Sequence, residues 1–249
     1  MTASTNATTR VAARAVDAVK TYGEGDAQVQ ALAGITVNFD RGQFTAIMGP
    51  SGSGKSTLLH CIAGLDSLTS GAVFIGDTDL GTLNDKALTL LRRDKVGFIF
   101  QAFNLIPTLN AEENIALPLS IAGKKPDPEW HDQVVGAVGL SDRLKHRPSE
   151  LSGGQQQRVA AARALVSRPE IVFADEPSGN LDSQSGAELL GFMRRAVDDL
   201  GQTIVMVTHN PLDAAYADKV IFLADGQTVD SMDNPTSERV LDRLKTLEA

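Results

Sequence analysis

The segment Gly-Pro-Ser-Gly-Ser-Gly-Lys-Ser at 49–56 limits the possible folds of this chain more than any other feature. It matches the pattern G-x-x-x-x-G-K-[ST] and stands between a short apolar run at 44–48 and a stretch of helical periodicity at 56–65. The glycines allow backbone conformations that other residues avoid, and they let amide groups surround an anion. The helix that follows directs the positive end of its dipole at the same point. A strand, a glycine-rich loop and a helix in this order predict a phosphate-binding loop within an α/β fold.

Individual positions of the loop have distinct expected roles. Lys55 brings a mobile positive charge to the β- and γ-phosphates, where it also serves catalysis, and Ser56 offers a hydroxyl to Mg²⁺. A chance match in a glycine-rich turn would occur in roughly 1 of 100 chains of this length, from average residue frequencies. The sequence therefore predicts a site for ATP or GTP. Nucleotide contacts are expected from Gly49, Ser51, Gly52, Ser53, Gly54, Lys55, Ser56 and Thr57.

A second apolar run, at 171–174, ends in two adjacent carboxylates, Asp175 and Glu176. In a parallel sheet the carboxyl ends of the strands face the ligand. We expect Asp175 to hold Mg²⁺ through its water shell and Glu176 to orient and deprotonate the attacking water. Taken alone, an acidic pair after a strand is more often a solvated turn or a helix cap. Its combination with a phosphate loop favours the hydrolytic role.

The rest of the chain alternates between strand-like and helical segments. Half-buried strands are expected at 13–22 and 32–39, and strands buried on both faces at 96–100, 204–207 and 220–223. Helical patterns occupy 155–166, 183–200 and 236–247. The block from about 102 to 150 contains five prolines and has helical rather than strand-like periodicity. We interpret it as a helical subdomain inserted into one α/β core.

Composition narrows the class of protein further. The 249 residues carry 23 Lys and Arg against 31 Asp and Glu, and the net charge of −8 disfavours general binding to nucleic acid. The single cysteine, Cys61, excludes an internal disulfide and fits a reducing compartment. No run approaches the roughly 18 apolar residues of a membrane span. Residues 1–12 are expected to form a flexible tail, with an organelle transit peptide as the less favoured reading. We expect a soluble, cytoplasmic protein.

A second glycine loop, Leu-Ser-Gly-Gly-Gln at 151–155, opens another helical stretch. Ser152, Gly153 and Gly154 could bind an anion at the start of that helix. Taken alone, such a sequence is most often an N-cap and a turn. One nucleotide per chain does not need two such sites. The second site is explained if two chains meet head to tail and each supplies it to the nucleotide of its partner.

In their order along the chain, these motifs resemble those of the nucleotide-binding domains of ABC transporters. The elements that carry the resemblance are the phosphate loop 49–56, Gln101, the loop 151–155, Asp175–Glu176, Ser178–Asp182 and His209. The resemblance implies one domain over 13–249, with the inserted helical subdomain at about 102–158. It also implies a P-loop NTPase (RecA-like) core with a mostly parallel sheet, and an N-terminal antiparallel β subdomain.

The resemblance assigns roles to residues outside the phosphate loop. Gln101 resembles the glutamine that couples the Mg²⁺ site to the membrane subunit and takes part in catalysis. Residues 152–154 resemble the signature loop that closes on the γ-phosphate of the partner chain, and Asp182 resembles a carboxylate that communicates between the two sites. His209 is similar to a switch histidine that contacts the γ-phosphate. Tyr22 stands where the family stacks an aromatic ring on adenine. Alone, His209 would more often be a structural histidine and Tyr22 an edge-strand aromatic.

A closer resemblance is to the subgroup of macrolide-export, lipoprotein-releasing and cell-division ATPases. It rests on the segments 21–32, 98–107 and 175–182, with Ser178 where threonine is frequent in the family. It implies ATP and Mg²⁺ as cofactors, a second copy of the chain, and a separate permease with few spans and a large outer domain. The chain would then sit on the inner face of the cell membrane through that permease.

The resemblance implies an ATP-hydrolysing transport subunit, with export as the expected direction. A socket for the permease is expected in 102–119, from Phe103, Leu105, Ile106 and Pro107, although each could equally belong to the subdomain core. A second hypothesis is a mechanical transmitter that acts on a membrane partner without transport, and the sequence leaves it open. A soluble relative in DNA repair or translation is disfavoured by charge and length. Cys61 and Trp130 are expected to be structural.

Overall fold

The computed structural model describes residues 11–247, apart from the side chain of Asp26. The predicted flexible tail therefore lies mostly outside the described residues, and positions 11 and 12 belong to the first strand. None of the helices within 11–247 is long and apolar enough to cross a membrane.

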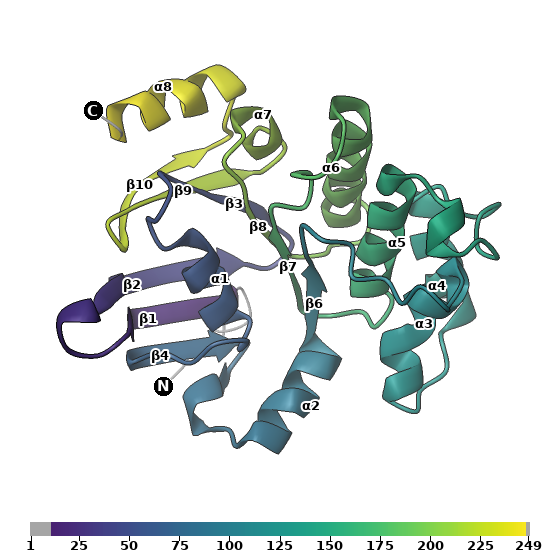
Figure 1. The fold of residues 1–249 in the computed structure, drawn as a ribbon, viewed down its shortest axis with the longest axis horizontal. Coiled ribbons are helices and arrows are strands. Elements are labelled where there is room, and N and C mark those ends of the chain that lie inside the picture. Colours follow the sequence, from purple (N-terminus) through teal and green to yellow (C-terminus); the bar gives the residue numbers. More distant parts are fainter. Residues whose placement is uncertain (1–10, 248–249) are drawn as a thin grey trace, which may run out of the picture.

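An antiparallel sheet occupies the N-terminal part of the described chain, as the sequence predicts. Its strand order is β2-β1-β4-β5. The strands are β1 (Val11–Tyr22), β2 (Val29–Asp40), β4 (Ser70–Ile75) and β5 (Thr78–Asp79). Every neighbouring pair runs antiparallel. In Figure 1 this sheet lies beside the larger one, with α1 packed against both.

A second, six-stranded sheet forms the centre of the molecule, in the order β10-β9-β3-β8-β7-β6. Its strands are β3 (Phe44–Met48), β6 (Val96–Ile99), β7 (Ile171–Asp175), β8 (Ile204–Val207), β9 (Lys219–Ala224) and β10 (Gln227–Asp233). All pairs are parallel except β9 and β10. The mostly parallel core predicted from the sequence is confirmed, and the carboxyl ends of β3, β6, β7 and β8 share one edge.

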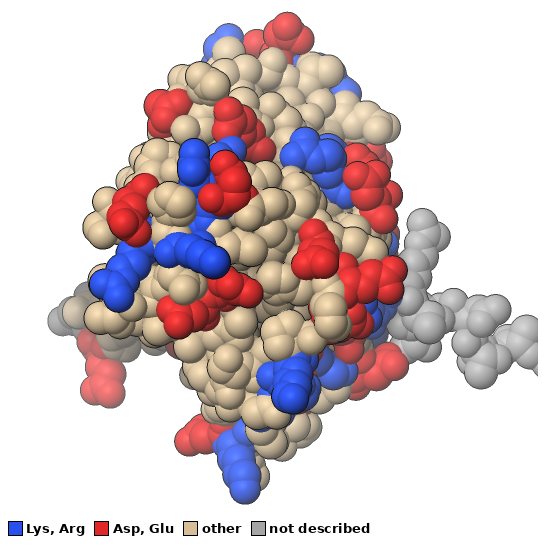
Figure 2. Space-filling view, turned by 90° about the vertical axis from the view of Figure 1, so that its right-hand side faces the viewer, with Lys and Arg blue, Asp and Glu red and all other residues tan. Residues whose placement is uncertain are grey.

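Helices cover both faces of this sheet (Figure 1). They are α1 (Lys55–Ile62), α2 (Asp85–Lys95), α3 (Ala111–Ile121), α4 (Pro128–Ala137), α5 (Gly153–Leu165), α6 (Ser183–Asp198), α7 (Pro211–Ala214) and α8 (Ser237–Leu247). Three short 3-10 turns add η1 (Gly25–Ala27), η2 (Leu80–Thr82) and η3 (Pro148–Glu150). The face that carries α3 to α6 has acidic and basic side chains interspersed (Figure 2).

The central sheet is buried on both faces, which explains its continuous apolar strands. Successive side chains of a strand point to opposite faces. Accordingly, Ile204 and Met206 of β8 belong to one hydrophobic cluster, whereas Val205 and Val207 belong to the other. Cys61 is 2% exposed within the second cluster, so the predicted structural role is consistent with its position.

The segment between β6 and η3 contains α3 and α4, in agreement with the predicted helical insertion. α3 begins with a capping box between Asn110 and Glu113, and Asp127 caps α4 just before Pro128. The Trp130 indole N–H donates to the carbonyl oxygen of Leu165 in α5 at 3.1 Å. This bond ties the insertion to the helix that follows the second glycine loop.

Candidate active site

Two glycines bring the phosphate loop close to the backbone of one strand from each sheet. Gly49 has a φ of +148°, and a Cβ added there would stand 2.0 Å from the carbonyl oxygen of Leu223 in β9. Gly54 is the N-cap of α1 with a φ of +96°, and an added Cβ would lie 2.3 Å from the carbonyl oxygen of Ala31 in β2. Because real Cβ atoms do not approach backbone oxygens so closely, both positions require glycine.

The side chains of Lys55 and Ser53 in the loop could both bind an anion. The Lys55 ammonium donates to the carbonyl oxygens of Gly49 at 3.0 Å and Pro50 at 2.7 Å. Burial lowers its pKa, although nearby carboxylates act in the opposite direction. The hydroxyl of Ser53 is buried and has no hydrogen-bond partner within the described residues. A buried hydroxyl without a partner is costly, and a phosphate oxygen would satisfy it. Of the other predicted contacts, Ser51, Gly52 and Ser56 are exposed and Thr57 is half-buried.

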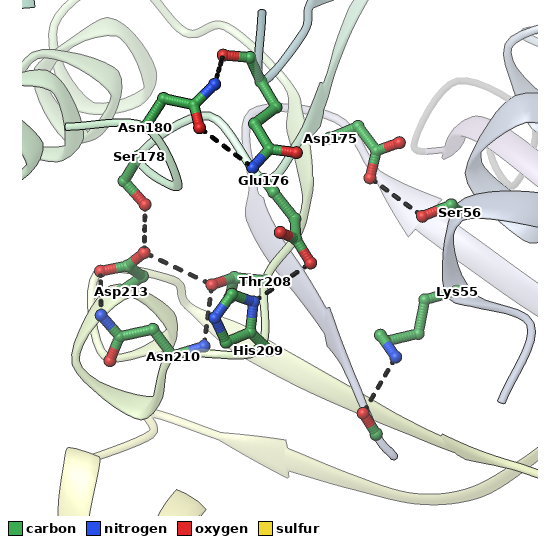
Figure 3. A network of polar contacts seen from close by, with 12 residues as sticks. Lys55, Ser56, Asp175, Glu176, Ser178, Asn180, Thr208, His209, Asn210 and Asp213 are labelled. Atoms are coloured by element: carbon green, nitrogen blue, oxygen red, sulfur yellow. Dashed lines mark hydrogen bonds and ion pairs between the residues drawn. The ribbon is translucent and has the colours of Figure 1, made fainter. Parts of the chain in front are cut away.

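The start of α1 meets the end of β7. The Ser56 hydroxyl donates to Asp175 Oδ1 at 3.1 Å, so the two predicted metal ligands are in contact (Figure 3). His60 Nε2, one turn further along α1, lies 3.3 Å from Asp175 Oδ2. Among the described residues, no group of three or more His, Cys, Asp or Glu side chains could hold a metal ion. A hydroxyl and one carboxylate suit Mg²⁺, which typically takes its other ligands from substrate phosphates and water.

The predicted base and the predicted switch histidine also meet. His209 Nδ1 lies 3.1 Å from Glu176 Oε1 (Figure 3). β7 and β8 are parallel neighbours, and the N–H of Glu176 donates to the carbonyl oxygen of Val207 at 3.0 Å. Glu176 has a φ of +46°, a left-handed conformation that a non-glycine residue rarely adopts. Backbone strain of this kind gathers at functional sites, where the surrounding structure maintains it.

The loop after β7 contacts Gln101, which stands two residues beyond the end of β6. The Gln101 side-chain amide donates to Asn180 Oδ1 at 3.4 Å, and the Asn180 amide donates to the carbonyl oxygen of Gln101 at 3.1 Å. Asp182 caps α6 by accepting from the N–H and the hydroxyl of Ser185. The backbone bond from Ser185 is the main reason why the pKa of Asp182 is lowered. Gln101 therefore lies beside the loop that follows β7.

The second glycine loop stands apart from the first. Ser152 caps α5 in a capping box with Gln155, and a Cβ added at Gly154 would lie 2.6 Å from the Ser185 hydroxyl. No hydrogen bond among the described residues joins 152–154 to the phosphate loop. In Figure 1, α5 and α1 lie on opposite sides of β6 and β7. One copy of the chain thus presents two separate glycine-rich helix starts, at α1 and α5.

Tyr22 is held at the end of β1 by a polar cluster. Its hydroxyl donates to Asp66 Oδ2 at 2.6 Å, while the Lys20 ammonium donates to Asp66 Oδ1 at 2.7 Å. The ammonium also lies 4.7 Å from the centroid of the Tyr22 ring. Burial and the bond to Asp66 raise the pKa of the Tyr22 hydroxyl. Tyr22 remains 42% exposed. The bond to Asp66 therefore fixes the orientation of the ring, while part of the Tyr22 surface stays free to stack on a base.

Four polar residues that contact the predicted ones were not found from the sequence: His60, Asp66, Asn180 and Asp213. Asn180 lies inside the motif 178–182, so its position there was a usable signal. The other three face the site only through tertiary packing. His60 in the last turn of α1, Asp66 after that helix and Asp213 within α7 have no spacing that distinguishes them from surface residues.

The site has the form of a P-loop nucleotide hydrolase: a glycine loop with a lysine, a serine against an aspartate, and a glutamate against a histidine. The comparison with known families is specific. The family model described as "ABC transporter" matches residues 32–179, and the chain belongs to that family. It is an ABC transporter ATPase, the ATP-binding subunit predicted from the sequence.

Similar proteins include export ATPases from several bacteria. The chain is 44% identical to the bacitracin export ATP-binding protein BceA of Halalkalibacterium halodurans, over 84% of this chain and 83% of that protein. It is 44% identical to the lipoprotein-releasing system ATP-binding protein LolD of Geobacter metallireducens, over 86% of this chain and 96% of that protein. It is 46% identical to the macrolide export ATP-binding/permease protein MacB of Brucella melitensis over 86% of this chain. The match spans only 33% of that longer protein.

A solved structure with the same fold is the ATP-binding cassette MJ0796 of Methanocaldococcus jannaschii, a dimer in a post-hydrolysis state bound to ADP and Pi. It is 40% identical to this chain, with a TM-score of 0.79 over 89% of this chain and 98% of that one. The likeness confirms the predicted fold class.

Proposed function

We propose that two copies of this chain bind ATP head to tail and use its hydrolysis to move a separate membrane permease of an export system. The observation that carries the proposal is that three contacts lie at one edge of the sheet. Lys55 bonds to the carbonyl oxygen of Gly49 in the phosphate loop, Ser56 bonds to Asp175, and Glu176 contacts His209. The dimeric cassette with ADP and Pi supports the paired arrangement. The names of the relatives, which refer to export or lipoprotein release, support the direction.

Binding begins at the phosphate loop. Loop amides and the dipole of α1 hold the phosphates, and the Lys55 ammonium exchanges its carbonyl partners for phosphate oxygens. The buried Ser53 hydroxyl gains the partner that it lacks within residues 11–247. Tyr22, held by Asp66, offers its exposed ring to the adenine by stacking.

A magnesium ion fits beside the phosphates. Ser56 would hold it directly, Asp175 through its water shell, and Gln101 from the next strand end. When bound, Mg²⁺ neutralises charge on the β- and γ-phosphate oxygens. Ser56 and Asp175 already contact each other, so little rearrangement is needed to present both oxygens to one ion.

Hydrolysis needs a base and a group that orients it. Glu176 takes the proton of the attacking water on a carboxylate oxygen. His209, 3.1 Å from Glu176 Oε1, holds that carboxylate and reaches the γ-phosphate with its other ring nitrogen. Both side chains are carried by the ends of adjacent parallel strands, which keep their separation small.

The second glycine loop acts on the other copy. Ser152, Gly153 and Gly154 of one copy close on the γ-phosphate held by its partner, and Asp182 lies between the two sites. This role explains why one chain has two helix starts suited to anions, at α1 and at α5. Within the described chain no hydrogen bond connects these two helix starts. Closure excludes water and completes each site only when both nucleotides are bound.

Motion passes to the permease through the segment 102–119. Leu105 packs against the protein core, whereas Ile106 is 40% exposed and available to a partner. A short permease helix that docks beside Gln101 would sense the state of the site. Because the chain acts through this contact, we place it in the cytoplasm, at the inner face of the cell membrane.

The substitution Glu176→Gln tests the catalytic proposal. It keeps the size of the side chain and removes the base, so ATP affinity is expected to stay within about twofold while turnover falls by about 10²–10⁴-fold. Glu238→Gln in the first turn of α8 is the matched control and is expected to hydrolyse ATP at the normal rate. A nearly normal rate for Glu176→Gln would remove this residue from the role of base.

The same variant tests the partner. Trapped with Mg-ATP in gently solubilised membranes of the source organism, it is expected to be purified together with a permease that has few spans and a large outer domain. A permease with many spans would contradict the subgroup, and cell-wall enzymes purified with the permease would favour the mechanical transmitter. Purification without any membrane protein would contradict coupling to a permease.

A further inference from the structure

Asp213 is a carboxylate on α7 that is only 6% exposed, and the hydrolytic scheme above does not use it. It accepts hydrogen bonds from three side chains: the hydroxyl of Ser178, the hydroxyl of Thr208 at 3.4 Å, and the amide of Asn210 at 3.0 Å. A buried carboxylate is costly unless such donors satisfy it, and bonds to an ionised acceptor are stronger than neutral ones.

The three donors come from the two loops that carry the proposed catalytic side chains. Ser178 stands two residues after Glu176 in the loop that follows β7. Thr208 and Asn210 flank His209 in the loop that follows β8. Figure 3 shows Asp213 to the left of the contact between Glu176 and His209, with bonds to both loops.

Local structure does not account for this placement. Asn210 already caps α7, since its side-chain oxygen accepts from the N–H of Leu212 at 3.0 Å. A cavity of about 200 Å³ is lined by Glu176, His209 and Asp213, among others. Packing therefore does not fill the space between the two loops. Hydrogen bonds to Asp213 span it instead, beside a Glu176 backbone in a left-handed conformation that its surroundings must maintain.

We propose that Asp213 is a positioning residue that ties the loop after β7 to the loop after β8 and so keeps Glu176 within reach of His209. The proposal rests on the catalytic roles given above to those two residues. Asp213 does not touch the nucleotide. Its loss lets the loops separate into the cavity, which lowers the turnover number and leaves nucleotide binding at the phosphate loop intact.

Variants of both partners of one bond test the tie. Asp213→Ala and Ser178→Ala are each expected to lower kcat at least tenfold while the Kd for ATP stays within twofold. Ser178→Thr restores the hydroxyl and is expected to keep kcat within twofold of the starting protein. The double variant Ser178→Ala/Asp213→Ala is expected to be no slower than the worse single variant, because both remove the same connection.

Asp218→Asn is the matched control. Asp218 accepts a bond from the N–H of Phe44 at 2.8 Å and pairs with Arg194 at 3.0 Å, but it lies at the opposite edge of the sheet, where β3 and β9 begin. Its kcat is expected to be unchanged. Urea unfolding of each variant separates a loss of kcat from a loss of folded protein.

Each outcome decides a different point. If Glu176→Gln is slow but Asp213→Ala and Ser178→Ala hydrolyse at the starting rate, the tie is refuted. If the two alanine variants lose ATP affinity and kcat together, Asp213 stabilises the whole fold and does not specifically position the two loops. That result also refutes the tie. If Glu176→Gln itself is active, the catalytic assignment fails first. Should Asp213→Ala not fold, the contrast of Ser178→Ala with Ser178→Thr decides alone.

Discussion

Gly49→Ala tests whether the shape of the phosphate loop is set by contact with β9. The added Cβ would stand 2.0 Å from the carbonyl oxygen of Leu223 and 3.0 Å from the hydroxyl of Ser53. The first of these atoms belongs to a paired strand, because Leu223 faces Thr228 of β10. The loop must therefore move away from the sheet, since the strand cannot.

The control is Gly52→Ala in the same loop. Gly52 has a φ of +79°, yet an added Cβ would meet no atom within 4 Å. It suffers only the left-handed strain of a non-glycine residue, about 1–2 kcal/mol. Gly49→Ala carries strain of that order together with an overpacking cost, typically 1–3 kcal/mol. We expect a loss of about 2–5 kcal/mol in the free energy of unfolding for Gly49→Ala.

Urea unfolding without nucleotide, monitored by far-UV circular dichroism, measures the free energy of unfolding of both variants. Titration with a fluorescent ATP analogue then reports the loop itself. Gly49→Ala is expected to bind ATP at least tenfold more weakly, because its loop amides no longer converge on the phosphates. Equal destabilisation of the two variants would refute the argument, since only one of them meets backbone in the folded protein.

Two further predictions concern the dimer and Tyr22. Ser152→Arg and Lys55→Ala are each expected to abolish hydrolysis alone. A mixture of the two variants is expected to regain it, because head-to-tail pairing leaves one site intact in each mixed dimer. An inactive mixture under conditions where dimers form would contradict the pairing. Asp66→Asn is expected to lose about 1–2 kcal/mol of stability at pH 7. Burial opposes ionisation of Asp66, but bonds from Lys20, Tyr22 and Ser67 outweigh it and bring its pKa below the ordinary 3.8. The advantage of the wild type is therefore full above about pH 4 and disappears as the pH falls through the lower folded-state pKa, whereas a difference that persists in acid would contradict it.

The parts that the sequence predicted well are those with strong local signals. The strands β3, β7 and β8 are continuous apolar runs because both of their faces are buried. α5 begins two residues before its predicted start, since the capping box of Ser152 and Gln155 includes both glycines in the first turn. Such signals depend on neighbouring residues alone, and a single sequence contains them.

The elements that escaped prediction lack such signals. α2 buries only Leu91, so it has no apolar stripe to reveal a helix. β10 is almost wholly exposed and exists because it pairs with β9, which no local pattern of β10 records. The contacts of Asp213 with Ser178 and of Asp66 with Tyr22 escaped for the same reason, since these partners stand 35 and 44 residues away in sequence.

The strand order explains how separated motifs form one site. Parallel pairing in the order β3-β8-β7-β6 sets Ile47 beside Val207, Val207 beside Asp175, and Ile99 beside Ala174. The ends of the four strands are therefore level. One predicted site group stands at each end: the phosphate loop after β3, His209 after β8, Asp175 and Glu176 at the end of β7, and Gln101 after β6.

The spatial order of these groups differs from their order in sequence. At roughly 4.8 Å between strands, the phosphate loop and Gln101 stand about 14 Å apart, at the two ends of a row. The histidine and the glutamate occupy the middle, where the γ-phosphate would reach. Gln101 at the far end borders the segment that we propose for the permease. In the scheme that we propose, motion on hydrolysis would pass from Glu176 to Gln101 through Asn180, which bonds Gln101 to the loop after β7.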